Sequence, residues 1–315
     1  MPEFAVSADL GDRKMSFDQI GSGLYGLTGA GDPNSGVIIG DDAVMVIDAQ
    51  PTPALAADLI ARIAKVTDRP VKYLLLTHFH AVCTLGASAY TGAQILASEA
   101  TRALLTERGQ QDLQSEIARF PRLYENADAN LGLTFPTVTF PDEVSIWLGR
   151  REVRIIHIGR GHTAGDVIAV VPDAGAVFAG DLVAAQTACY CGDAYVNDWR
   201  ATLDNLAEMQ AAVLFPGRGG ALTTPQAVAE AIAQTSDFLD TLGSSVGDSV
   251  GKGRSLKEAF EFARLAMDPK FKPFALYEHC LPFNVARAYD EARGIEEPTV
   301  WTAERDREIW AALQG

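Results

Sequence analysis

Two histidines separated by one residue directly follow a short apolar run in the first third of the chain. The run is Val71–Leu76, with Pro70 before it and Thr77, His78 and His80 after it. Its length and composition predict a buried strand, with the histidines where the strand opens into a loop. Side chains at positions i and i+2 of an extended backbone point to the same side, so both imidazoles can reach one metal ion.

Four other segments place polar residues after apolar stretches or within glycine-rich turns. In chain order they are Val44–Asp48, Gly161–Asp166, Phe178–Asp181 and Phe215–Gly220. Together with the histidine pair, their order resembles the motifs of the metallo-β-lactamase superfamily, whose first motif is Thr-His-x-His-x-Asp-His. The resemblance extends over roughly residues 20 to 222.

This resemblance implies an α/β fold, the αββα four-layer sandwich, in which two mixed β-sheets lie face to face and helices cover both outer faces. Residues 1–222 are expected to form the metallo-β-lactamase-like domain, with the first sheet from the N-terminal half and the second from about residue 138 to 215. Residues 223–315 lack a convincing strand pattern and are expected to form a helical C-terminal extension packed on that domain.

Local patterns predict elements that fit this order. The expected strands are Gly36–Gly40, Ala43–Asp48, Val71–Leu76, Ile95–Ala97, Val138–Phe140, Val144–Trp147, Val153–His157, Val167–Val171, Ala176–Asp181 and Ala211–Gly217. The expected helices are Thr52–Val66, Glu99–Arg108 after the cap Ser98, Trp199–Gln210, and one that begins within Gly86–Tyr90. Residues 110–136 are polar and are interpreted as an inserted helical excursion near the mouth of the site.

The resemblance implies that His78, His80 and His162 hold one metal ion, with Asp181 as a further ligand or as a partner of a ligand. A single histidine in a core is more often packed than ligating, but three at matching positions favour a common role. Zn²⁺ is the expected ion, Fe is the alternative, and a site without any metal is the third possibility.

The ligands of the second metal ion found in two-metal members of the superfamily are missing. Val82 and Cys83 stand at its Asp and His positions, and Arg218 stands at the position of the last His. A guanidinium stays charged and donates five hydrogen bonds, so Arg218 beside Asp181 could supply the positive charge of the second ion. At most one metal ion is therefore expected. Cys83 is interpreted as a small buried residue, with a thiolate ligand as the alternative.

Three functions remain open. The first is a hydrolase for an ester, lactone, thioester or amide of unknown identity, because Zn²⁺ on three imidazoles lowers the pKa of a bound water to about 7. Asp181 and Arg218 are then the catalytic candidates, and Asp166 and Tyr195 are further candidates for proton transfer. The second is a non-catalytic pseudoenzyme that binds a small ligand in the old pocket. The third is a mono-iron oxygenase resembling the persulfide dioxygenases.

Other polar residues have weaker signals. Asp48 is expected to orient the histidines, and His157 is expected to be packed in a strand rather than catalytic. His279 lies outside the region of resemblance, and facing away from the pocket is the favoured interpretation. The pair Cys189 and Cys191 is too weak a pattern for a metal or redox site.

Composition limits the partners. The net charge of −15 disfavours nucleic acid and an anionic membrane surface, and a small-molecule substrate or ligand is expected instead. Four sparse cysteines, an N-terminus without a basic-then-apolar leader pattern and the lack of a long apolar stretch together favour a cytoplasmic protein. Trp301, Ile309 and Trp310 could support a homodimer or pack on their own subunit.

Overall fold

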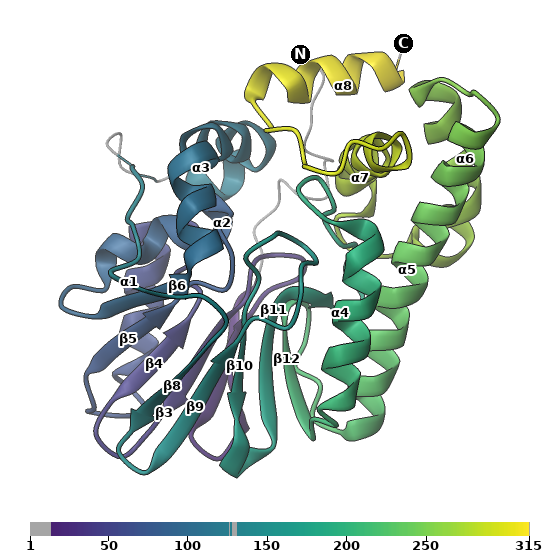
Figure 1. Ribbon diagram of the computed structural model, residues 1–315. Helices are drawn as coiled ribbons and strands as arrows, with labels where there is room; N and C mark the ends of the chain where they lie inside the picture. Colours follow the sequence, from purple (N-terminus) through teal and green to yellow (C-terminus); the bar gives the residue numbers. More distant parts are fainter. Residues whose placement is uncertain (1–13, 126, 128–130, 315) are drawn as a thin grey trace.

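Two mixed β-sheets lie face to face in the computed structural model, which describes residues 14–125, 127 and 131–314 (Figure 1). The seven-stranded sheet has the order β1 (Ser16–Gly21), β2 (Leu24–Thr28), β3 (Ser35–Ile39), β4 (Val44–Ile47), β5 (Val71–Leu75), β6 (Gln94–Ser98) and β7 (Val138–Phe140). The five-stranded sheet has the order β12 (Val213–Arg218), β11 (Ala176–Ala184), β10 (Ile168–Val171), β9 (Arg151–Ile156) and β8 (Glu143–Leu148).

Helices cover the outer faces of both sheets (Figure 1). On the side of the first sheet lie α1 (Pro53–Ile63), the short α2 (Ala81–Thr84), the 3-10 turns η2 (Leu85–Ala89) and η3 (Pro121–Tyr124), and α3 (Glu99–Arg119). On the side of the second sheet lie α4 (Val196–Glu208) and α5 (Pro225–Gly251). The chain continues through α6 (Leu256–Phe271), α7 (Tyr277–Ala292) and α8 (Ala303–Gln314), and the 3-10 turn η4 (Pro172–Ala174) joins β10 to β11. The predicted αββα sandwich with a helical C-terminal region is therefore confirmed.

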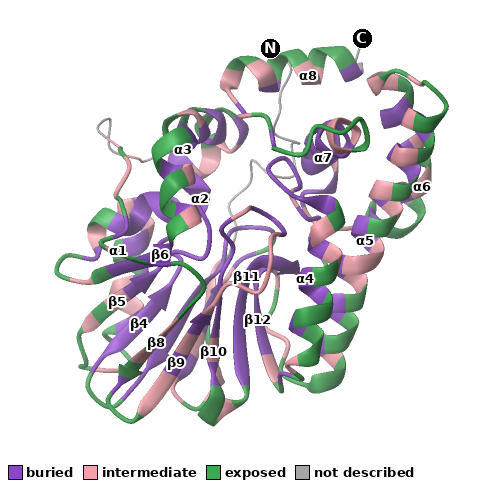
Figure 2. Ribbon diagram, viewed as in Figure 1, coloured by how far each residue is buried: buried purple, intermediate pink, exposed green. Residues whose placement is uncertain are grey.

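The inner faces of the two sheets form one apolar layer (Figure 2). The rings of Phe178 on β11 and Phe215 on β12 lie 5.6 Å apart at its centre. Glycines on the opposing sheet make room for them, because a Cβ at Gly36 would lie 2.4 Å from Phe178 and one at Gly26 would lie 2.2 Å from Phe215. Burying each aromatic side chain stabilises the fold by roughly 1.5–3 kcal/mol, so this layer holds the sheets together.

The helices begin where the sequence places a cap. The side chain of Thr52 accepts a hydrogen bond from Leu55 N at 3.2 Å, with Pro53 in the first turn of α1. Ser98 accepts from Thr101 N at 3.0 Å and starts α3 in the same way. The cap of α3 comes at the predicted residue, but the helix continues to Arg119, eleven residues beyond the predicted end at Arg108.

The observed elements differ from the predicted ones in several other respects. The strand Val138–Phe140 pairs in parallel with β6 and so belongs to the first sheet, whereas the sequence had placed it in the second. Residues 110–119 continue α3 rather than forming a separate insert, and positions 126 and 128–130 of the predicted insert lie outside the described residues. Residues 85–89 form a 3-10 turn where a helix was expected to begin. Strands β1 and β2 were not predicted.

The C-terminal helices share a core with the second sheet. Apolar residues of β11, α4, α5, α6 and α7 form one buried cluster, and α5 packs on β11 and β12. The proposed boundary between residues 222 and 223 falls in the connection from β12 to α5. Trp301 is 2% exposed, and its Nε1 donates to Gly192 O at 2.9 Å, so this residue packs on its own chain. The proposed homodimer stays a prediction.

Within the described part of the chain, no helix is long and apolar enough to cross a membrane. The segment Met1–Ala5, which shows no leader pattern in the sequence, lies outside the described residues.

Candidate metal centre

Three buried histidines meet at one end of the sandwich. His78 and His80 lie in the loop that leads from β5 to α2, and His162 lies in the loop between β9 and β10. One ring nitrogen of each lies within 4.8 Å of the other two, and His80 Nδ1 is 2.9 Å from His162 Nε2. The convergence predicted from the sequence is present, and the role of these residues as ligands stays a prediction.

In each of the three imidazoles, the ring nitrogen that faces away from the other two rings contacts a neighbouring oxygen. The contacts are His78 Nδ1 with Thr77 Oγ1 at 2.9 Å, His162 Nδ1 with the Tyr190 carbonyl at 2.9 Å, and His80 Nε2 with Asp193 Oδ2 at 3.1 Å. A carbonyl and a carboxylate accept, and the Thr77 hydroxyl donates to Asp48 Oδ2 at 2.8 Å, so in each case the imidazole is the donor. A neutral imidazole then keeps its lone pair on the nitrogen that faces the other two rings.

The residues present fit a bound cation. The buried His78 Nε2 has no hydrogen-bond partner among the described residues, although it points to where the three rings meet. Imidazole N–H groups held by oxygens are the usual arrangement around metal-ligating histidines, because they fix both the tautomer and the ring orientation. A metal ion at this point would take the place of a proton shared between His80 Nδ1 and His162 Nε2.

Burial and mutual repulsion set the charges of the rings. Burial, followed by repulsion from the other imidazoles, lowers the pKa of His162 to about 3 and that of His78 well below its usual value. Burial also acts to lower the pKa of His80, but the hydrogen bond to Asp193 and the nearby acidic charges outweigh it and raise that pKa. At neutral pH two of the three rings are therefore neutral, as metal binding requires.

Asp181 and Arg218 lie side by side at the same end of the sandwich. Arg218 Nε donates to Asp181 Oδ2 at 3.3 Å, and the same oxygen lies 3.6 Å from His162 Nε2. Burial would raise the pKa of Asp181, but Arg218 and the imidazoles outweigh it and hold that pKa well below its usual range. The buried Asp181 Oδ1 has no hydrogen-bond partner in the described chain and lies against Gly217, where a Cβ would come within 1.9 Å of it, so Oδ2 is the oxygen that faces the histidines.

A glycine directs Asp181 toward the site. Gly180 has a φ of +54°, and the pairing of β11 with β12 shifts register there. A Cβ at this position would lie 2.8 Å from Thr77 Oγ1, so a larger residue would displace the threonine beside His78. Arg218 ends β12 and also donates from Nη1 to Gly31 O at 2.9 Å, which fixes the guanidinium beside Asp181.

Val82 and Cys83, the two positions that depart from the first motif of the superfamily, are both buried. Burial raises the pKa of the Cys83 thiol well above its usual value, so this side chain is a neutral thiol in the absence of a metal. Its sulfur lies within 4.8 Å of ligand atoms of Asp48 and His78, and a thiolate role for it therefore stays untested. Both Asp48 carboxylate oxygens accept hydrogen bonds from Thr77, whose hydroxyl in turn contacts His78 Nδ1 at 2.9 Å.

The structure does not bring the other proton-transfer candidates to the centre. Asp166 uses its two carboxylate oxygens on Thr163, at 2.6 and 2.8 Å. The Tyr195 hydroxyl donates to Glu297 Oε2 at 2.6 Å. His157 Nδ1 contacts Asp166 O at 2.8 Å, in line with a packed histidine.

His279 is also fully buried, with its ring 4.2 Å from that of Phe120, and it does not line the cavity at the histidines. The thiols of Cys189 and Cys191 are buried and free.

A small cavity lies against the histidines. Its volume is about 10 Å³, roughly the space of one water molecule. It is lined by His80, Val82, Glu116, Phe120, His162, Asp181, Ala188, Tyr190, Arg218, Leu276 and Cys280. Residues of α3 and α7 thus enclose the site, and an organic substrate could reach it only if these helices move.

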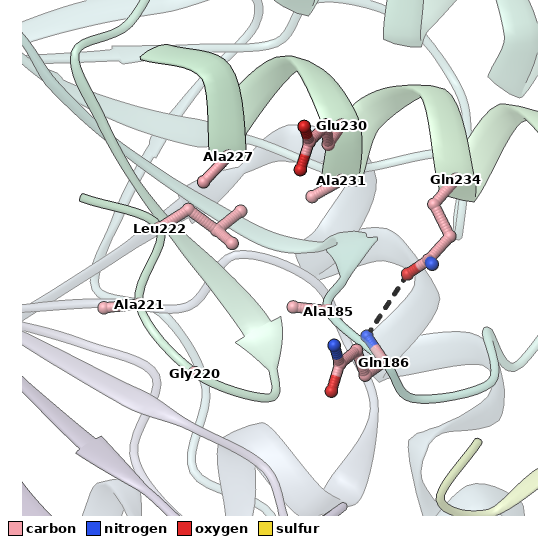
Figure 3. Close-up of a pocket in the computed structure, with 9 residues that line it drawn as sticks. All are labelled: Ala185, Gln186, Gly220, Ala221, Leu222, Ala227, Glu230, Ala231 and Gln234. Carbon is pink, nitrogen blue, oxygen red and sulfur yellow. Dashed lines mark hydrogen bonds between the residues drawn. The ribbon is translucent and has the colours of Figure 1, made fainter. Parts of the chain in front are cut away.

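A larger pocket, whose described lining includes none of the three histidines, is drawn in Figure 3. It measures about 370 Å³ and lies between α5 and the residues that follow β11 and β12. Of its nine described lining residues, Glu230 is the only titratable one, and Gln186 N donates a hydrogen bond to Gln234 Oε1 at 3.4 Å. This pocket therefore offers no arrangement suited to catalysis or to metal binding.

Several site residues were not found from the sequence. Asp193 binds His80, and Arg108 Nη1 lies 3.5 Å from the other oxygen of Asp193. Glu116 and Tyr190 line the cavity. Arg108 was expected only as the last residue of a helix, and Glu116 lay in the polar segment 110–136, interpreted as an inserted helical excursion near the mouth of the site. No pattern singled out either residue. The short Gly192-Asp193 turn was the available signal for an oxygen ligand to His80, but nothing in its spacing indicates that contact.

Comparison with known proteins decides the family. A sequence profile described as the metallo-beta-lactamase superfamily matches residues 28–218, more than half of the 315-residue chain. The chain belongs to the metallo-β-lactamase superfamily. The matched range begins at the end of β2 and ends with Arg218, so it contains the other motifs that carried the resemblance in full and the last one, Phe215–Gly220, as far as Arg218.

Solved members of the superfamily share this fold at low sequence identity. The metallo-beta-lactamase from Pontibacter korlensis superposes with a TM-score of 0.59 at 20% identity, over 72% of this chain and 99% of that one. The metallo-beta-lactamase DIM-1 superposes with a TM-score of 0.55 at 18% identity, over 72% of this chain and 97% of that one.

A relative of known activity is the linear primary-alkylsulfatase of a Pseudomonas species. It is 22% identical over 256 residues, which amount to 71% of this chain and 48% of the relative. This chain therefore spans about half the length of the curated relative that it matches.

Proposed function

We propose that this protein is a single-metal hydrolase in which His78, His80 and His162 hold the ion and Asp181 faces it. The observation that carries the proposal is the meeting of three imidazoles, each with its other nitrogen held by an oxygen, around an unpartnered His78 Nε2. Zn²⁺ suits this donor set, with Fe as the alternative. When bound, it would supply Lewis acidity and a water of lowered pKa.

The residues of the chain supply the remaining parts of a hydrolytic site. Arg218 lines the cavity and carries a fixed positive charge, so it can stabilise the oxyanion that forms when an acyl or similar centre is attacked. Asp181 anchors Arg218 through Oδ2, the same oxygen that lies 3.6 Å from His162 Nε2. The occupation of the second-ion region by this ion pair supports one ion per chain.

An ester is the bond class that we favour among the ester, lactone, thioester and amide candidates. The match to a protein named linear primary-alkylsulfatase supports this choice, since that name denotes cleavage of a sulfate ester. A small-molecule substrate is expected, because the lining of the cavity mixes apolar residues such as Phe120 and Leu276 with few charges.

A second candidate, a non-catalytic protein that binds a small ligand, is favoured by the size of the cavity. A volume of about 10 Å³ admits one water or one ion, so only a ligand of that size, and no ester, fits while α3 and α7 are docked. The two candidates differ in whether α3 and α7 part to admit a substrate.

Elemental analysis after zinc reconstitution tests the proposal. About one zinc per chain, lost in the His78→Ala variant, together with hydrolysis of 4-nitrophenyl acetate or 4-nitrophenyl sulfate, supports the hydrolase. Zinc without turnover favours the binding protein, and iron in the protein as purified favours the oxygenase. In the triple variant Val82→Asp, Cys83→His, Arg218→His, the zinc content should rise toward two ions per chain. A zinc content that stays at or below one ion per chain contradicts our account of Arg218.

A further inference from the structure

One carboxylate in the cavity is only half used. Glu116 on α3 is 4% exposed, and its Oε1 accepts a hydrogen bond from Arg119 Nη2 at 2.7 Å. Its Oε2 is buried and has no hydrogen-bond partner within the described ranges. Glu116 lines the same small cavity as His80 and His162. The unused oxygen therefore belongs to a side chain that borders the candidate metal centre.

A buried carboxylate oxygen without a partner is unfavourable, because the group has lost its hydration and gained nothing in return. The cavity beside it has the volume of one water molecule, about 10 Å³. A water there would meet Glu116 as an acceptor on one side and the histidine cluster on the other. The geometry thus provides a place for one water between the carboxylate and the site of the ion.

Glu116 supplies a carboxylate to a cavity that lacks the Asp of the superfamily motif. Val82, which stands where the superfamily motif has an Asp, lines this cavity with an apolar side chain. Asp181 contacts Arg218 and His162 through Oδ2, and its Oδ1 lies against Gly217. Glu116 is the remaining carboxylate among the described residues that line the cavity, and it reaches the cavity from a different helix.

We propose that Glu116 is a catalytic residue, the proton acceptor for the water that attacks the substrate; this inference rests on the proposed hydrolase function. Glu116 Oε2 takes one proton from the water as the water oxygen forms a bond to the electrophilic centre of the ester. The bond to the leaving oxygen then breaks, and Glu116 returns the proton to that oxygen. One water and one ester give one acid and one alcohol, and Glu116 ends ionised as it began.

The surroundings hold Glu116 in this orientation. Arg119 is fully buried, and its guanidinium lies 4.8 Å from the ring of Tyr190 and 4.9 Å from that of Phe283. Its Nε is 3.9 Å from Asp306 Oδ2 on α8. Because Arg119 is held by Phe283 of α7 and Asp306 of α8, it fixes Oε1 of Glu116 and leaves Oε2 without a hydrogen bond on a side chain that lines the cavity.

The test uses Glu116→Gln, which keeps the size of the side chain and an acceptor for Arg119. The matched control is Glu99→Gln, which removes the same charge from the exposed first turn of the same helix. Thermal unfolding and zinc content establish that each variant is folded and loaded. In the zinc-loaded protein, Glu116→Gln should lower kcat for 4-nitrophenyl acetate about 10²–10⁴-fold with KM changed little, and Glu99→Gln should change neither.

A second readout does not depend on turnover. A crystal structure of the zinc-loaded wild type should show a water about 2.6–3.2 Å from Glu116 Oε2 and next to the histidines. The inference is overturned if that water is absent, or if Glu116→Gln turns over as fast as the wild type. A wild-type protein that binds zinc but hydrolyses neither probe instead overturns the proposed function, and the catalytic role of Glu116 with it. Glu116→Asp, which keeps the charge but shortens the reach, should also lose turnover.

Discussion

Replacing Asp193 by alanine tests whether the histidines form a metal site. Asp193 is 5% exposed, accepts from His80 Nε2 at 3.1 Å and lies 3.5 Å from Arg108 Nη1. Without the carboxylate, His80 loses the group that fixes its tautomer and its ring orientation. Losing such a partner lowers metal affinity about 10–100-fold, or roughly 1.4–2.7 kcal/mol of binding free energy.

The same change also lowers stability. Removing one partner of a buried ion pair costs about 3–5 kcal/mol. Arg108 keeps the Pro298 carbonyl at 3.2 Å and Glu107 at 3.1 Å, so we expect the lower end of that range for the free energy of unfolding. Asp193→Asn, which keeps an acceptor for His80, should lose less than about tenfold in zinc affinity.

Zinc affinity is measured by competition with a chelating dye, and stability by calorimetry of the metal-free protein. Asp198→Asn on α4 is the control, since this half-exposed carboxylate pairs with Arg160 on the surface. If Asp193→Ala is destabilised as expected but keeps its zinc affinity within about twofold, His80 does not depend on Asp193 for binding, and the reasoning is refuted.

Two further outcomes follow. In the metal-free protein, NMR of the ring nitrogens from pH 5 to 8 should find His162 neutral throughout, because burial lowers its pKa to about 3. His80 should remain charged above pH 6.5, because its pKa is raised. A common titration midpoint near pH 6.5 for the two rings contradicts this. Because an ion must displace the His80 proton, zinc affinity should rise with pH until that pKa is passed. Ending the chain after Glu297 removes α8 and leaves Arg119 without the buried Asp306, so calorimetry should show a melting midpoint at least about 5 °C lower; an unchanged midpoint contradicts the docking of α8.

The parts of the fold that the sequence predicted are those set by local patterns. His78 and His80 directly follow an apolar strand. The helix caps Thr52 and Ser98 each accept a hydrogen bond from a backbone N–H only three residues later in the chain. Strand Val138–Phe140 was assigned to the wrong sheet because its partner β6 lies about forty residues earlier, and nothing local distinguishes the two sheets.

The second half of α3 shows why part of the site could not be predicted. Asp112, Glu116 and Arg119 make this stretch look like a solvated surface, and the sequence was interpreted as a polar insert. Asp112 accepts a hydrogen bond from Ala81 N on α2, and Arg119 is covered by Phe283 of α7 and Asp306 of α8, more than 150 residues later. The contact of His80 with Asp193 spans 113 residues in the same way. Charged residues of this kind become recognisable as interior only once the covering helices are placed.

The covering of the histidines by α3 and α7 has a consequence for how an ion would arrive. Leu276 and Cys280, at the start of α7, and Phe120, at the end of α3, border a space that is no larger than a water. A hydrated divalent ion is larger than that space, so it must enter before these helices dock or while they are parted. Uptake and release would then be slow compared with the chemistry at an open site, and a chelator would remove the ion at the rate at which the helices open.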